Sequence, residues 1–281
     1  MKKFALQTAH QKILADTLTP VSAYLKLRDV FPHSLLLESS DYHANNNDFS
    51  YICCNPIAWI ELKNKKLSTH YPDGSTQTIP VDPDVNIPEK IHQFSQQFDN
   101  QKFPFKFISN GIFGYIAHDA VDQFENIQLD KAKPGHDIPD IYYAVYQNII
   151  AISLFNHEAH LFSHVYEGTH NLSEIKRILD AKSSSKFSFE KVGKKTSNLT
   201  DEQFIDFVKK GKEHCYRGDV FQLVLSRRFS QEFKGDEFNV YRTLRSINPS
   251  PYLFFFDYGN FKIFGSSPEA QLIVQNGKAE I

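Results

Sequence analysis

Two short stretches of the sequence carry residue types that bind metals or react with oxidants. His157-Glu158-Ala159-His160 resembles half of a zinc signature, but its histidines are one residue too close for one face of a helix. The stretch also falls at a predicted hairpin turn, so a solvated turn is the better interpretation. Cys53 and Cys54 are adjacent in an apolar stretch, and neighbouring side chains on a strand point to opposite faces. Buried packing is therefore favoured over redox chemistry.

Two later stretches are harder to assign to packing alone. Gly218–Arg228, "GDVFQLVLSRR", ends a strongly apolar predicted strand with two arginines. Ile247–Tyr258, "INPSPYLFFFDY", places two prolines directly before an aromatic strand. Each proline fixes φ and removes an N–H donor, which makes a rigid strand entrance with carbonyl groups left for another partner. An edge strand guarded by prolines explains the same residues.

The elements that must position these stretches are mostly strands joined by hairpins. Alternation and turn signals predict strands over 34–41, 50–63, 66–71, 138–166 (a hairpin turning at 156–157), 220–229, 252–258 and 261–265. Caps and helical spacing predict helices that begin at Thr19-Pro20, lie within 86–98 and over 172–179, run from a capping box at Thr200 to Gly218, cover 238–247, and begin at Ser267. Single helices among hairpin strands predict an α+β fold of mainly antiparallel β-sheets layered with helices.

A change of composition divides the chain. Residues 181–198 are rich in serine and lysine and lack a sustained apolar period, which predicts a linker. With this linker at 181–199, residues 1–180 form one domain and residues 200–281 begin another. The last ten residues, "LIVQNGKAEI", contain Asn276-Gly277, the strongest short hairpin signal. Its return arm has barely begun at Ile281, so we expect the chain to stop inside a domain.

Composition and charge argue against several classes of protein. The 281 residues are 41% hydrophobic and 23% charged, which is typical of globular proteins. A net charge of -2 gives no reason to expect a nucleic-acid or anionic-membrane partner. No apolar run approaches the ~20 residues of a membrane span, and the N-terminus lacks the features of a signal peptide. Three cysteines, Cys53, Cys54 and Cys215, fit free buried thiols in a reducing compartment, which suggests the cytoplasm.

Several of these stretches, taken in order, resemble one enzyme family. "GDVFQLVLSRRF", "YRTLRSINPSPYLFFF" and "FGSSPEAQLIV" resemble the start of the chorismate-binding domain of anthranilate synthase component I. Upstream, "SLLLESSD" resembles the Leu-Leu-Glu-Ser segment of that family, and "GIFGYIAHDAV" its Gly-Tyr segment. The relatives to exclude are aminodeoxychorismate synthase and the isochorismate and salicylate enzymes. The combination of "LLLES" with "NPSPYLFFF" favours anthranilate synthase.

The resemblance implies different functions for the two parts of the chain. Residues 1–180 would be the effector-binding N-terminal domain, and 200–281 the first, incomplete portion of the catalytic domain. The whole protein would convert chorismate and ammonia to anthranilate and pyruvate in tryptophan biosynthesis, with Mg²⁺ as cofactor and a glutamine amidotransferase subunit, component II, supplying ammonia. The chorismate-contacting residues and the Mg²⁺-binding glutamates of the family lie beyond Ile281, so no catalytic or metal-binding residue is assigned and this chain is expected to be inactive. Arg227 and Arg228 stay without a role, because strand alternation sends them to opposite faces.

The resemblance also implies a feedback site for L-tryptophan within the chain. Matching motifs place Glu38 and Ser39 on one side of the ligand and Pro251, Tyr252 and Leu253 on the other. Glu38 would pair with the ligand ammonium, Ser39 would bond its polar head group, and the proline-freed carbonyls would also accept from the ammonium. Leu253 stands where the family usually has methionine, which keeps the pocket apolar. Residues 40–51 after this motif are less typical of the family.

Two other functions remain open from the sequence. One is aminodeoxychorismate synthase component I, an enzyme of folate synthesis with the same substrate. The other, for this chain taken by itself, is a non-catalytic tryptophan-binding module. Product analysis separates the first alternative from anthranilate synthase, and ligand binding without turnover identifies the second.

Overall fold

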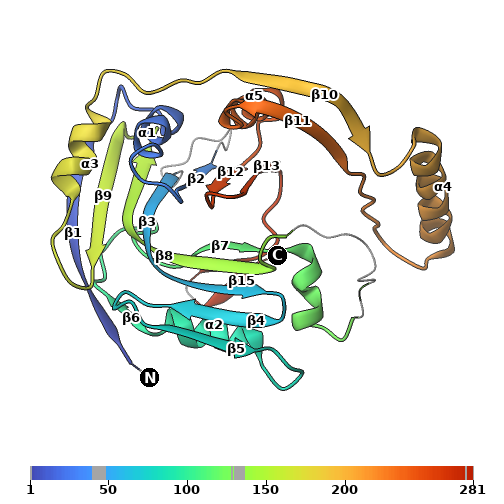
Figure 1. The fold of residues 1–281 in the computed structure, drawn as a ribbon, viewed down its shortest axis with the longest axis horizontal. Coiled ribbons are helices and arrows are strands. Elements are labelled where there is room, and N and C mark those ends of the chain that lie inside the picture. The colour runs from blue at the N-terminus through green and yellow to red at the C-terminus, as the bar shows by residue number, and fades with distance from the viewer. Residues whose placement is uncertain (1, 40–48, 128, 130–136, 276, 281) are drawn as a thin grey trace. The chain divides into compact units, whose positions relative to one another are not determined.

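A large, mostly antiparallel sheet joins early and late parts of the chain in the computed structural model (Figure 1). The structure describes residues 2–39, 49–127, 129, 137–275 and 277–280. They form two compact units: Met1–Lys186 together with Thr243–Ile281, and Phe187–Arg242. We call these the larger and the smaller unit. The predicted division into 1–180, 181–199 and 200–281 stays a prediction.

The sheet of the larger unit runs in the order β13-β12-β2-β3-β8-β9-β1-β6 through the described residues. Its strands are β1 (Phe4–Leu14), β2 (Leu35–Ser39), β3 (Ser50–Lys63), β6 (Phe98–Asn100), β8 (Ile141–Ser153), β9 (Glu158–Val165), β12 (Tyr252–Asp257) and β13 (Lys262–Ser267). Off this path lie β4 (Lys66–His70), β5 (Thr76–Pro80) and β7 (Phe113–Ile116). The β1–β6 pair is parallel and the other pairs are antiparallel. Late strands β12 and β13 therefore extend a sheet that early strands began.

The central strands β3 and β8 are long and mostly apolar, so both of their faces can be buried. Cys53 and Cys54, neighbours on β3, are both fully buried, which confirms packing for this pair. Burial raises the pKa of both thiols. Asn64 and Lys65 adopt positive φ between β3 and β4, as a tight hairpin turn requires.

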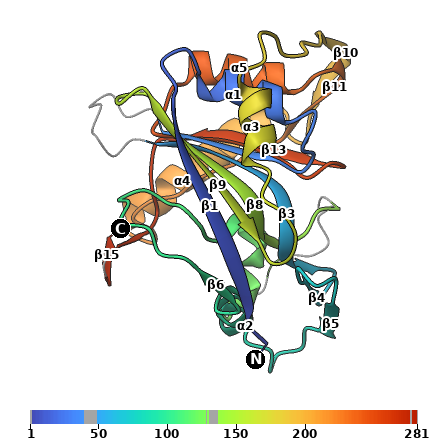
Figure 2. The same cartoon turned by 90° about the vertical axis from the view of Figure 1, so that its left-hand side faces the viewer.

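The helices are inserted singly between strands along the chain, as expected for the fold class. They are α1 (Pro20–Leu27), α2 (Ile87–Ser95), α3 (Leu172–Leu179), α4 (Asp201–Arg217) and α5 (Phe238–Ile247), with a 3₁₀ turn η1 (His118–Gln123). α1 packs on β2, β3 and α3, and Figure 2 shows α1 and α3 next to each other beside the strands. The hydroxyl of Thr19 accepts a hydrogen bond from the Ser22 amide (3.1 Å), and Pro20 follows at the first helical position. The predicted α+β fold, with mainly antiparallel sheets and helices, is confirmed.

The smaller unit contains α4, a two-stranded sheet of β10 (Phe189–Ser197) and β11 (Phe229–Gly235), and the start of α5 up to Arg242. The capping box is present: Thr200 Oγ1 accepts from the Gln203 amide (3.2 Å), and Gln203 Oε1 accepts from the Thr200 amide (2.9 Å). Gly218 ends α4 in the left-handed region at φ 79°. β10 lies inside the stretch predicted as a linker, because its polar side chains gave no apolar alternation.

Three local predictions are wrong. Residues 220–228 form no strand, because no other strand of the described chain pairs with them. Ser267 starts no helix; it ends β13, and its hydroxyl instead donates to the Glu269 carbonyl (3.0 Å). Cys215 is exposed on α4, so it is a free thiol but not a buried one.

The histidine pair of the zinc-like stretch is also placed differently from the solvated turn that we expected. His157 does occupy the turn, with φ 53°, but His160 is buried on β9. Its ring stacks on His10, with the two ring nitrogens 3.0 Å apart. No group of three or more His, Cys, Asp or Glu in the described residues is arranged to hold a metal ion.

The terminal hairpin is confirmed by β14 (Ile273–Gln275) and β15 (Lys278–Glu280), which pair antiparallel. Gly277 has φ 75°, while Asn276 lies outside the described residues. Among the described helices, none is both long and apolar enough to cross a membrane.

His164 on β9 is a buried neutral histidine. Its Nε2 donates to the Ser109 carbonyl (2.9 Å), and its Nδ1 accepts from the Thr8 hydroxyl (2.8 Å). Burial lowers the pKa of His164 to about 4, with a smaller lowering from His170 and an opposing contribution from the Ser109 hydrogen bond. Both ring nitrogens are already hydrogen-bonded in the neutral ring, so a second proton would place a charge in a buried site and reverse the hydrogen bond from Thr8.

We predict that this histidine makes the chain less stable as the pH falls from about 6.5 to about 4. In that window the unfolded chain takes up a proton that the folded chain does not, so at pH 5 the free energy of unfolding falls by about 2 kcal/mol relative to neutral pH. Urea unfolding at a series of pH values measures this. His164→Gln removes the dependence, whereas the exposed His92→Gln on α2 keeps it; equal pH profiles for the two variants would contradict the assignment.

Candidate functional site

The two segments that the sequence placed around one ligand lie side by side in the larger unit. β2 pairs antiparallel with β12, with Ser39 opposite Tyr252 and Glu38 opposite Leu253. Pro251 directly precedes β12 and contributes no N–H to the sheet. The structure thus brings together the five predicted residues, although no ligand tests their role.

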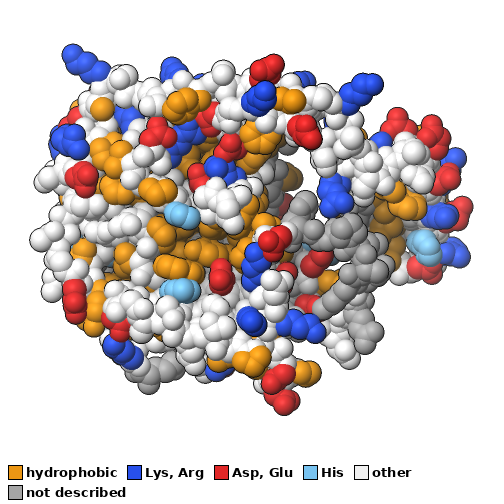
Figure 3. All heavy atoms as spheres, in the orientation of Figure 1, with side chains coloured by type: hydrophobic (Ala, Val, Ile, Leu, Met, Phe, Trp, Pro, Cys, Tyr) orange, Lys and Arg blue, Asp and Glu red, His pale blue; other side chains and the backbone are white. Residues whose placement is uncertain are grey.

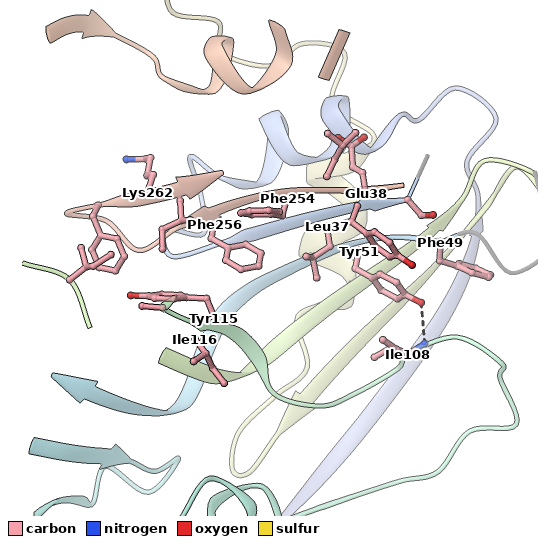
Figure 4. Close-up of a pocket in the computed structure, with 17 residues that line it drawn as sticks. Leu37, Glu38, Phe49, Tyr51, Ile108, Tyr115, Ile116, Phe254, Phe256 and Lys262 are labelled. Atoms are coloured by element: carbon pink, nitrogen blue, oxygen red, sulfur yellow. Dashed lines mark hydrogen bonds between the residues drawn. The ribbon is translucent and has the colours of Figure 1, made fainter. Parts of the chain in front are cut away.

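Strand alternation separates these residues into two sets. Residues directly opposite each other on antiparallel strands share a face. Ser39 and Tyr252 therefore lie on one face with Leu37 and Phe254, while Glu38 and Leu253 lie on the other. In Figure 4, Glu38 points away from the side to which Leu37 and Phe256 point. Only one set of side chains can enter a pocket on either face.

A pocket of about 900 Å³ lies on the Ser39 face. The strands contribute Leu37, Ser39, Tyr51, Tyr252, Phe254, Phe256 and Ile263 to its wall, and the facing wall includes Phe49, Ile108, Tyr115, Ile116, Ala117, Ile138 and Phe261. Glu38, Leu253 and Lys262 also border the pocket, but strand alternation directs their side chains to the other face of the sheet. Figure 3 shows hydrophobic side chains gathered at the surface over the middle of the larger unit, where Figure 1 places β3 and β8. The pocket is therefore an aromatic cavity rather than a charged cleft.

Two tyrosines fix the facing wall. Tyr51 on β3 accepts a hydrogen bond from the Ile108 amide through its hydroxyl (3.1 Å; Figure 4). Tyr115 on β7 donates its hydroxyl proton to the Pro139 carbonyl (2.8 Å). β7 approaches β8 closely at Gly114, where a Cβ would overlap the Tyr142 carbonyl oxygen. With their hydroxyls engaged, both tyrosines present mainly ring surface to the cavity.

Burial keeps these phenols uncharged. It raises the pKa of Tyr51, and it raises that of Tyr115 further with help from the nearby Asp140 and Glu61 carboxylates. Both phenols therefore stay neutral at physiological pH. The pocket offers mainly uncharged ring surface to a ligand.

Glu38 and Lys262 are charged residues along the pocket wall, and both form ion pairs outside the pocket. Arg245 on α5 places Nε 3.1 Å from both carboxylate oxygens of Glu38. Lys262 lies opposite Asp257 in the β12–β13 register, on the Glu38 face, and its Nζ is 3.7 Å from that carboxylate. In Figure 4, the ammonium of Lys262 lies away from the rings of Phe254 and Phe256. The expected pairing of Glu38 with a ligand ammonium stays a prediction, and the carboxylate already has Arg245 as a partner.

The arginines left without a role lie in the smaller unit. Arg227 donates to Asp201 Oδ1 (2.6 Å) and to the Leu199 carbonyl (2.8 Å). These contacts join the start of α4 to the segment before β11. Arg227 thus has a structural explanation that the sequence did not suggest.

Sequence reasoning missed most of the facing wall. Tyr115 belongs to the stretch "GIFGYIAHDAV", which carried the resemblance without a residue role. Tyr51 and Ile108 carried no recognisable signal, because only long-range pairing brings them to the pocket. Residues 40–48, which follow the Glu38-Ser39 motif, lie outside the described residues.

Comparison with known proteins gives one consistent family. The family model for chorismate binding enzymes matches residues 34–281. Anthranilate synthase component 1 of Aquifex aeolicus (strain VF5) is 31% identical over 96% of this chain and 57% of that protein. The protein of the same name from Lactococcus lactis subsp. lactis is 30% identical over 95% of this chain and 59% of its own length.

A solved structure agrees with these relatives. Anthranilate synthase component I from Streptococcus pneumoniae TIGR4 matches with a TM-score of 0.59 and 25% identity, over 96% of this chain and 60% of that chain. The chain thus spans less than two thirds of the length of each of these proteins.

We predict that Gly265→Ala reshapes the pocket through Phe254. Gly265 lies opposite Phe254 on β13, and a Cβ there would come within 2.8 Å of the Phe254 ring tip. The ring must move, which costs about 1–3 kcal/mol of stability. Equilibrium urea unfolding measures the cost in the wild-type and Phe254→Leu backgrounds. A shorter side chain at 254 removes most of the penalty, so an equal cost in both backgrounds would show that the ring is not the obstacle.

Proposed function

The chain belongs to the chorismate binding enzyme family, and from this premise we propose that it is part of the large subunit of an anthranilate synthase. The proposed reaction of the whole protein converts chorismate and ammonia to anthranilate and pyruvate in tryptophan biosynthesis. Its support is the pair of relatives named anthranilate synthase component 1, each about 30% identical across nearly all of this chain. A glutamine amidotransferase subunit, component II, is the proposed ammonia source, and the free cysteines support a cytoplasmic location.

Magnesium belongs to the proposal for the whole protein only. Mg²⁺ binds carboxylate oxygens and would neutralise a substrate carboxylate. The described residues contain no suitable cluster of three or more His, Cys, Asp or Glu.

The function proposed for this part of the protein is binding of L-tryptophan as a feedback inhibitor. The observation that carries it is the pairing of β2 with β12, which makes one wall of an aromatic pocket from both predicted segments. Burying an indole of about 200 Å² contributes roughly 5 kcal/mol before the costs of ordering the ligand. The indole lies among the rings of Tyr51, Phe254 and Phe256, and Ser39 offers a hydroxyl to the head group.

We predict that L-tryptophan binds the chain in isothermal titration calorimetry and that two substitutions weaken it. Phe254→Ala removes ring contact, and Ser39→Ala removes a hydroxyl whose hydrogen bond contributes roughly 0.5–1.5 kcal/mol, or a factor of about 2 to 10 in affinity. Ser95→Ala, on α2 and outside the pocket wall, is the matched control. Equal affinities for Ser39→Ala and Ser95→Ala would remove Ser39 from the site, and no binding by the wild-type chain would overturn the effector proposal.

We further predict that the chain alone forms no anthranilate from chorismate, Mg²⁺ and ammonia. It spans 57–60% of the compared proteins, and its described residues provide no metal-binding carboxylate cluster. Anthranilate fluorescence is the measurement, with the Lactococcus lactis relative assayed in parallel as positive control. Fluorescence above a no-enzyme blank would contradict this prediction, and chromatography would show whether the product is anthranilate or aminodeoxychorismate.

A further inference from the structure

Glu38 borders the pocket, but strand alternation directs its carboxylate to the opposite face of β2, where it forms an ion pair. Both of its oxygens lie 3.1 Å from Arg245 Nε. The Glu38 side chain is only 2% exposed, whereas that of Arg245 is 41% exposed. A buried carboxylate requires such a partner, because removing a charge from water without compensation is costly.

The surroundings of Glu38 are apolar on the same face. Its cross-strand neighbour Leu253 is 2% exposed, and the next pair on that face, Leu36 with Phe255, is also buried. Phe255 in turn contacts the ring of Tyr24 on α1 edge-on. The carboxylate thus lies among apolar side chains on the face of β2 and β12 opposite to that of Ser39 and Tyr252.

We propose that Glu38 is a positioning residue that does not touch the ligand. By holding Arg245, it fixes the end of β2, and with it the pocket-facing Ser39 and Tyr252. The pocket then recognises an indole by its aromatic side chains and the Ser39 hydroxyl, and an ammonium group gains nothing from Glu38. This inference rests on the proposed effector function and gives a different role to the residue that sequence resemblance assigned to the ammonium.

A pair of ligands that differ only in the ammonium tests the proposal. L-Tryptophan and indole-3-propionate are titrated calorimetrically into the wild-type chain, Glu38→Gln and Arg245→Gln. Both variants should weaken both ligands alike, so that the ratio of the two dissociation constants stays within about twofold of wild type. If Glu38 received the ammonium, Glu38→Gln would reduce the preference for L-tryptophan about tenfold or more, while Arg245→Gln would not. That result would overturn the proposal.

A second measurement does not depend on any ligand. Urea unfolding of the two single variants and of the double variant shows whether the residues act as a unit. The double variant should have the same unfolding midpoint as the less stable single variant. Arg242→Gln, three residues earlier on α5 and bonded to Asn239 (3.1 Å), is the matched control and should add its effect independently to that of Glu38→Gln. Additive losses for Glu38 and Arg245 would overturn the positioning role.

The two measurements also separate this proposal from the effector function. If the wild-type chain binds neither ligand, the proposed effector function fails, and the unfolding cycle alone decides whether Glu38 positions β2. If L-tryptophan binds and the ratio changes only in Glu38→Gln, the effector function stands and the positioning role fails.

Discussion

The antiparallel pairing of β2 with β12 is the constraint on which the rest of the site depends. It joins two segments far apart in the sequence through one continuous register, from Ser39 opposite Tyr252 to Leu35 opposite Phe256. A shift of one residue would turn every side chain of β2 to the opposite face. The register therefore decides that Ser39 faces the pocket and that Glu38 faces α5.

The two faces of this strand pair have different chemistry. On one side, the ion pair of Glu38 with Arg245 and the contact of Phe255 with Tyr24 hold the strands against helices. On the other side, tyrosine hydroxyls bonded to backbone groups hold the facing wall in place. The pocket lies on the second of these faces, between the strands and the facing wall. Polar contacts at its margins hold its shape, and its interior offers mainly ring surface.

Sequence signals succeeded where the partners of a residue lie close along the chain. The capping box of Thr200 and the short connection between the strands predicted over 50–63 and 66–71 are each complete within four residues, so the local sequence pattern identified them. The strand expected over 220–229 needed a neighbouring strand that local sequence patterns cannot identify. In the described residues, 220–228 form no strand. The same limit applies to the site. The motif placed Glu38 near the ligand, but only the register of β2 shows which way its side chain points.

Because the three cysteines differ in burial, chemical modification of their thiols reports whether the central sheet is folded. Cys53 and Cys54 lie on both faces of β3 at the centre of the sheet, and burial raises the pKa of both thiols, so they stay protonated and shielded. Cys215 on α4 is exposed. A thiol-specific reagent therefore reaches one site in the folded chain and gains two more only when the sheet opens. The number of modified thiols thus counts how many molecules have lost the central strand, without any added probe.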